Sequence, residues 1–176
     1  MGNKQSSNLR ILMIGLDSAG KTSTLLSLKN LEKQQTIPTV GYNVETIIYK
    51  NTKLNIWDIG GQTNIRPLWR RHFLGTQAII FVIDSADADR FEEAKTILYQ
   101  SLESNELADI PLIILANKQD QVNASSIDQI VRFFGFDRNL GNRPWKIEGT
   151  CATNGEGLGK VAEWLYQQIK KKGSKT

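Results

Sequence analysis

Residues 15–22, Gly-Leu-Asp-Ser-Ala-Gly-Lys-Thr, constrain this chain more than any other segment. They match the pattern G-x-x-x-x-G-K-[ST], follow the apolar run 9–15 and precede a helix-like segment, 21–31. Glycines let such a loop bend without Cβ clashes, and the helix presents its positive end, so backbone N–H groups can surround a polyphosphate. An ordinary glycine turn is the alternative, but the flanking strand and helix patterns favour a phosphate-binding loop.

Two side chains of this loop have specific expected roles. Lys21 should reach the β- and γ-phosphates, and the Thr22 hydroxyl should bind Mg²⁺. Further contacts to the nucleotide are expected from Asp17, Ser18, Ala19, Gly20 and Ser23. The loop alone leaves kinases, ATPases and GTPases open, so another segment must identify the base.

The segment Asn117-Lys118-Gln119-Asp120 directly follows a buried-strand pattern, and ligands of open α/β sheets bind at the carboxyl ends of strands. The Asp120 carboxylate can accept from guanine N1–H and N2–H₂ together, whereas adenine offers no such donor pair. Lys118 would lie along the base plane, and Asn117 would tie this loop to residues 15–22. A polar turn is the alternative for this segment alone, but after a phosphate-binding loop it predicts a guanine nucleotide, GDP or GTP. A P-loop kinase would leave the segment unexplained.

Three further positions are expected to sense the γ-phosphate. Asp58 ends a predicted strand and can hold a water of Mg²⁺, while Gly61 can bring its N–H to the phosphate and Gln62 can orient the attacking water. Thr39 would complete the Mg²⁺ shell only while the γ-phosphate is present; a solvent-facing hydroxyl is the alternative. Loss of the phosphate would release both loops, which describes a switch.

The chain alternates predicted strands and helices, which is typical of the α/β class. We expect a six-stranded, mostly parallel sheet with one antiparallel strand and helices on both faces. The expected strands are 9–15, 42–50, 52–58, 78–84, 111–117 and 145–149. Asn51 marks a tight turn that makes the second and third strands antiparallel. Apolar residues with a 3.6-residue period predict helices within 127–134 and 158–169.

Composition agrees with one domain that has a core of its own: 176 residues, 40% of them apolar. No run of 18 apolar residues and no signal peptide occurs, and the one cysteine fits a cytosolic protein. The net charge of +4 is modest, and lysines near the end of the chain supply much of it. Nucleic acid is therefore not an expected partner.

Across nearly its whole length the sequence resembles the Arf group of small GTPases. The similarity is carried by GLDSAGKT, TIPTVGYNVETIIYKN, WDIGGQTNIRPLWR, FVIDSADADR, LANKQD and CATNGEGL. Ras and Rab proteins differ from W-D-I-G-G-Q and from the I-R-P-L-W-R that follows it. The resemblance implies the P-loop small-GTPase fold. We expect a GTP-binding domain at 9–172, a short polar arm at 1–8 and a flexible basic tail at 173–176.

The resemblance also implies roles for residues and partners. Cys151 and Ala152 would lie in a second guanine loop, with the Ala152 N–H on the base carbonyl. Gln62 and Lys21 would serve catalysis, but residues 34–40 contain no arginine to act as a finger, so hydrolysis should be slow and depend on an activating protein. A guanine-nucleotide exchange factor and effector or coat proteins are the other expected partners of a monomer.

Family members usually present three aromatic residues to effectors, and the matching positions here are Tyr42, Trp57 and His72. The histidine departs from the usual tyrosine, and it leaves the effector open. A polar rim position is the alternative for His72.

The start of the chain, Met1-Gly2-x-x-x-Ser6, fits N-myristoylation at Gly2. The arm is short and polar where relatives carry an amphipathic helix, and one myristoyl chain binds membranes only marginally. Lys4 and the C-terminal lysines can add electrostatic attraction, or they form a solvated tail. We therefore expect either a cytosolic switch that reversibly joins endomembranes such as the Golgi in vesicle traffic, or an Arf-like binding module that acts through carrier or effector proteins with little role for hydrolysis.

Overall fold

The structure, a computed structural model, describes residues 8–31 and 43–173. Several residues with predicted roles lie outside these ranges, among them Gly2, Lys4, Thr39 and Tyr42, and so do residues 174–176 of the predicted tail. Within the described ranges, none of the helices has the length and apolar character needed to cross a bilayer.

The described residues form a six-stranded sheet in the order β2-β3-β1-β4-β5-β6. The strands are β1 (Asn8–Gly15), β2 (Asn43–Tyr49), β3 (Thr52–Asp58), β4 (Ala78–Asp84), β5 (Leu112–Asn117) and β6 (Trp145–Gly149). Only the β2–β3 pair is antiparallel, which confirms the predicted fold class. Lys50 and Asn51 both have positive φ, 46° and 63°, as a two-residue type I′ turn requires.

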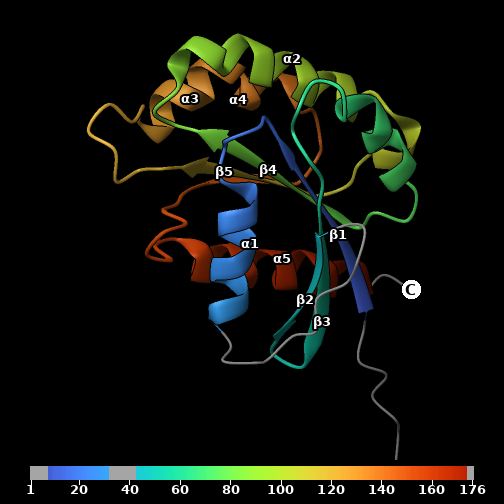
Figure 1. Cartoon of the computed structure of the whole chain (residues 1–176). Helices are drawn as coiled ribbons and strands as arrows, with labels where there is room; N and C mark the ends of the chain where they lie inside the picture. Colours follow the sequence, from blue (N-terminus) through green and yellow to red (C-terminus); the bar gives the residue numbers. More distant parts are fainter. Residues whose placement is uncertain (1–7, 32–42, 174–176) are drawn as a thin grey trace, which may run out of the picture.

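Helices cover both faces of the sheet, as predicted (Figure 1). One face carries α1 (Lys21–Asn30) and α5 (Leu158–Gly173), and the other carries α2 (Phe91–Leu102), α3 (Ile127–Phe134) and α4 (Phe136–Asn139). Short 3₁₀ helices complete the described part: η1 (Arg66–His72), η2 (Ala88–Arg90) and η3 (Asn105–Leu107). Pro111 precedes β5 because proline has no N–H to donate to the sheet.

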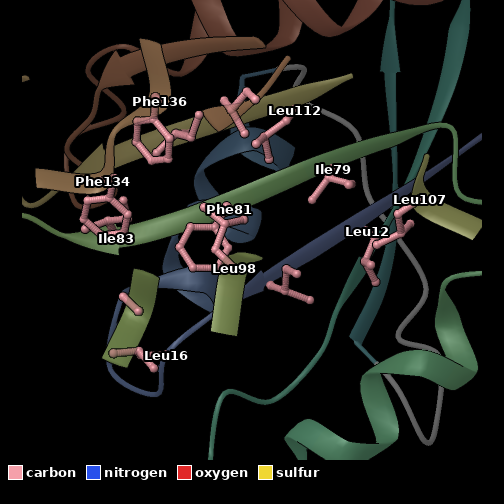
Figure 2. Packing of buried hydrophobic residues seen from close by; sticks show 14 of the residues in the cluster. Leu12, Leu16, Ile79, Phe81, Ile83, Leu98, Leu107, Leu112, Phe134 and Phe136 are labelled. Carbon is pink, nitrogen blue, oxygen red and sulfur yellow. The ribbon is translucent and has the colours of Figure 1, made fainter. Parts of the chain in front are cut away.

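Alternating side chains of the central strands supply two separate cores. Ile79, Phe81 and Ile83 of β4 pack on the α2–α3–α4 side, while the intervening residues pack toward α1 and α5. Figure 2 shows this first cluster, with Phe134 and Phe136 beside the strand. The two rings stack with centroids 5.1 Å apart. The period of two in β4 therefore lets a single buried strand anchor both helix layers.

The tip of the β2–β3 hairpin is held against α5. The Tyr49 hydroxyl donates to Glu163 Oε2 over 2.5 Å, and Lys50 Nζ lies 2.7 Å from the same oxygen. These contacts, the Lys50 hydrogen bond first, lower the pKa of Glu163 to about 2. The opposite end of the hairpin, where β3 ends at Asp58, lies at the carboxyl edge of the parallel sheet.

The strand order reverses at β1. This strand lies between β3 and β4. After β1 the chain first forms β2 and β3 on one side of it, and then β4, β5 and β6 on the other side. A crevice outside the carboxyl end of such a strand is the expected ligand position in open α/β sheets. The loop 15–22 leaves β1 at this point.

Candidate functional site

The loop between β1 and α1 turns sharply at two left-handed residues. Ser18 has φ 63° and Gly20 has φ 96°. A Cβ on Gly20 would lie 2.3 Å from Asn117 Nδ2, so this position has no room for a side chain. Gly20 is also the N-cap of α1, whose first turn contains no acidic residue. The loop thus brings backbone amides and a positive helix end together, which suits an anion.

Lys21 lies buried beneath this loop. Its Nζ donates to the carbonyl oxygens of Gly15 at 3.0 Å and Leu16 at 2.8 Å. Burial lowers the pKa of Lys21, and the charges of Asp58 and Asp17 oppose that effect. Carbonyl groups solvate an ammonium without neutralising it, so the loop places a buried cation where a polyphosphate would meet it.

Thr22 and Asp58 meet where α1 begins and β3 ends. The Thr22 hydroxyl donates to Asp58 Oδ2 over 2.7 Å. Mg²⁺ in nucleotide sites uses one or two protein oxygens and completes its shell with phosphate oxygens and water. Among the described residues no group of three or more His, Cys, Asp or Glu side chains forms a metal cage. A hydroxyl and a carboxylate at the phosphate loop fit a magnesium ion shared with phosphates.

The segment after β3 packs directly on the phosphate loop. A Cβ on Gly61 would lie 2.3 Å from Gly15 O and 2.4 Å from Asp17 N, so only glycine allows this approach. Side chains from η1 hold the segment. Arg66 Nε donates to Gly61 O over 2.9 Å, and Trp69 Nε1 donates to Gly60 O over 2.8 Å. The next residue, Gln62, is exposed.

Asn117, at the end of β5, joins three loops. Its side chain is 1% exposed, and Nδ2 donates to Ala19 O over 2.9 Å. Its Oδ1 accepts from Thr150 Oγ1 and from the Ala152 N–H, each over 3.2 Å. The phosphate loop, residues 117–120 and the loop after β6 are therefore fixed relative to one another by one buried amide.

The residues expected to contact the base lie around this amide. Lys118 has φ 64°, and its Nζ lies 2.6 Å from Asp84 Oδ2 at the end of β4. Asp120 is exposed in the turn that follows, while Ala152 and Cys151 are buried in the neighbouring loop. The site thus has an exposed carboxylate, Asp120, two residues after the half-buried Lys118.

Two residues that the sequence analysis did not single out, Arg90 and Glu93, join the site through ion pairs. Arg90 Nη2 lies 2.8 Å from Asp17 Oδ1, and Arg90 Nε lies 2.9 Å from Glu93 Oε2. Arg66 Nη2 contacts Glu93 Oε1 at 2.7 Å and lies 3.6 Å from Asp17. Hydrogen bonds from Arg90 lower the pKa of both carboxyls. Asp17, an acidic residue within a phosphate loop, indicated that a cationic partner was needed. The sequence does not say which arginine pairs with it.

Trp57 and His72, two of the residues predicted to face effectors, lie next to each other. Their ring centroids are 5.7 Å apart, and the Arg10 guanidinium lies 4.1 Å from the Trp57 ring centroid. His72 is buried, with its pKa lowered first by desolvation and then by the charges of Arg10 and Arg71. Their role in effector binding stays a prediction.

Replacing Asn117 by Ala should lower the free energy of unfolding by about 1–3 kcal/mol, because buried groups in two loops lose their partner. Denaturant unfolding measures this change. The exposed Asn142→Ala is the matched control, with an expected change within about 0.5 kcal/mol. Equal stability of both variants would show that the Asn117 amide does not hold the loops together.

Comparison with known proteins agrees with this geometry. The family model described as the ADP-ribosylation factor family matches residues 1–169. The structure of the Arl6 (BBS3) small GTPase from Trypanosoma brucei with bound nucleotide analogue GppNp superposes with a TM-score of 0.85 and 28% sequence identity, and the match covers 94% of this chain and 99% of that chain. The chain therefore belongs to the ADP-ribosylation factor family of small GTPases, whose fold binds GTP and GDP.

Proposed function

We propose that this protein is a nucleotide-controlled switch that binds GDP or GTP with Mg²⁺, hydrolyses GTP slowly and recruits effectors to membranes in vesicle traffic. The observation that carries the proposal is the buried Asn117 amide, which joins the phosphate loop to both loops expected at the base. Asn117 keeps the phosphate-binding loop at a fixed distance from the loops expected to bind the base. One nucleotide can therefore span both parts of the site.

Guanine selectivity would come from Asp120 and its neighbours. Its exposed carboxylate can accept from both guanine donors, and the stem of the half-buried Lys118, two residues earlier, would lie along the base plane. The Ala152 N–H, which donates to Asn117 Oδ1 over 3.2 Å, would share or exchange that hydrogen bond for one to the base carbonyl. Cys151 is buried next to it and serves packing rather than chemistry.

The phosphates would lie on the loop of residues 17–20, with Lys21 neutralising their charge and Ser23 at the first turn of α1. Thr22, Asp58 through a water, and Thr39 from outside the described residues would hold Mg²⁺, which supplies charge neutralisation at the phosphate oxygens. The Gly61 N–H would meet the terminal phosphate.

Catalysis would rest on Gln62, which can orient water beside Gly61, and on Lys21. The two arginines beside the phosphate loop, Arg66 and Arg90, are both paired with carboxylates. Neither is then positioned as an arginine finger, so fast hydrolysis would need an arginine or equivalent from an activating protein. An exchange factor and effector or coat proteins complete the proposed partners of the monomer.

Asp120→Asn should weaken GDP binding by about 10²- to 10⁴-fold, because two hydrogen bonds to a charged acceptor contribute about 1.5–3 kcal/mol each. Xanthine nucleotide should bind this variant better than guanine nucleotide does, since the amide can donate to the 2-oxo group. Titration with fluorescent nucleotides measures both affinities, with exposed Asp89→Asn as control. Unchanged guanine preference in Asp120→Asn would contradict the assigned role.

Gln62→Leu should lower hydrolysis stimulated by an Arf-family activating protein by at least about 10²-fold, because the attacking water loses its positioning group. Nucleotide binding should remain, and the exposed Gln100→Leu should hydrolyse GTP like the unmodified protein. Phosphate release in single turnover measures the rates. Unstimulated hydrolysis as fast as the stimulated reaction would overturn dependence on a partner.

A second candidate function is an Arf-like binding module that acts through carrier or effector proteins. The polar composition of residues 1–8 favours it. Membrane recruitment would instead use myristate at Gly2, assisted by Lys4 and by the lysines at the end of α5, on the cytosolic side of endomembranes such as the Golgi. Effectors would meet Trp57 and, from outside the described residues, Tyr42, while the buried His72 would act through its contact with Trp57.

Liposome flotation separates these two functions. Protein co-expressed with a myristoyl transferase should float only when it carries a non-hydrolysable GTP analogue, and Gly2→Ala should stay unbound, because one acyl chain is the main anchor. Equal flotation in the GDP and GTP-analogue states would favour the binding module.

A further inference from the structure

We propose that Arg90 is a positioning residue for the terminal phosphate. By holding the Asp17 carboxylate in an ion pair, it lets a triphosphate occupy the phosphate loop, so its loss weakens GTP binding more than GDP binding. This inference rests on the proposed nucleotide site and assigns a residue outside its motifs.

Asp17 places a negative charge inside a loop built for an anion. Its side chain is 40% exposed, and its backbone N lies directly against Gly61, the residue expected at the terminal phosphate. The carbonyl of the preceding residue, Leu16, is one of the two that Lys21 Nζ contacts. The carboxylate therefore stands at the terminal-phosphate end of the loop rather than at the base.

A carboxylate at this place would repel a triphosphate more than a diphosphate. Like charges a few ångströms apart in a partly buried site interact strongly, and the added phosphate of GTP carries the nearest extra charge. A neutralising partner for Asp17 thus affects the two nucleotides unequally.

Arg90 supplies that partner with a two-pronged contact. Its Nη2 lies 2.8 Å from Asp17 Oδ1, its Nη1 lies 3.3 Å from Oδ2, and Nη1 also reaches the Asp17 carbonyl at 3.4 Å. Paired guanidinium and carboxylate groups of this kind have fixed geometry, which a lysine would not reproduce. Arg90 ends η2 directly before α2, so it is presented from the rigid α2 side of the sheet.

Glu93 holds the pair and extends it to the other side of the site. It contacts Arg90 at 2.9 Å and Arg66 at 2.7 Å, and Arg66 Nε donates to Gly61 O. Two arginines and two carboxylates make this cluster electrically neutral. Removing Arg90 would leave a net negative charge between the phosphate loop and Gly61, where the terminal phosphate is expected.

The test compares release of two ligands, fluorescent GDP and a fluorescent non-hydrolysable GTP analogue, from the full chain. We expect Arg90→Gln to speed release of the triphosphate about tenfold, equivalent to about 1.4 kcal/mol, and release of GDP less than about threefold. Adding Asp17→Asn to Arg90→Gln should restore the ratio of the two rates, because the carboxylate that lost its closest partner, and keeps only Arg66 at 3.6 Å, is then gone. Exposed Arg132→Gln on α3 is the control and should leave both rates unchanged.

A merely structural role for Arg90 would give a different pattern. Equal acceleration of both ligands by Arg90→Gln, or a ratio that Asp17→Asn does not restore, would overturn the inference while leaving the proposed nucleotide site intact. Unmodified protein that binds neither guanine nucleotide would overturn the proposed function and the inference together. Arg90→Lys, which keeps the charge but loses the two-pronged contact, should release the triphosphate at an intermediate rate.

Discussion

The candidate site depends on one buried amide. Asn117 ends a fully buried strand, so its position is set by the core, and both ends of its side chain are occupied by groups from other loops. A buried donor or acceptor without a partner costs about 1–3 kcal/mol, which makes this arrangement all-or-none. The phosphate loop, the base-reading loop and the loop after β6 consequently keep one spacing, and that spacing decides which ligands can span the site.

Two glycines make the close approach of these loops possible. Gly20 leaves room for the Asn117 amide, and Gly61 lies against the backbone of the phosphate loop. Each place is filled by a neighbouring backbone or amide group, so any Cβ would displace part of the site. The fixed half of the site belongs to β1 and β5, whereas Gly61 belongs to a segment held by η1 side chains. A ligand that displaces Gly61 would therefore also displace η1, whose last residue, His72, lies beside Trp57.

The charged side chains of the site fall into two groups, a buried cation and paired acidic residues. Lys21 is buried among carbonyls, and the carboxylates of Asp17 and Glu93 are each paired with arginine. Within residues 8–31 and 43–173 no carboxylate forms an ion pair with the buried Lys21 ammonium, whereas the more exposed Asp17 and Glu93 are paired with arginine. This asymmetry leaves a local positive field at the helix end, where a polyphosphate is expected.

The sequence by itself determined the fold class, the six strands and the motifs of the site, because these follow from local patterns: the continuous apolar run of β4, the tight turn at Asn51, and the glycines of residues 15–22. It did not predict α2, η1, or the ion pairs of Arg90 and Glu93, because many arginines and carboxylates are equivalent along a chain. The sequence also indicated a surface position for Trp57 and His72. It did not indicate that Arg10 covers the Trp57 ring or that His72 is buried. Only tertiary structure decides such pairings, since they join residues on separate elements whose distances are set by packing of the sheet and its helices.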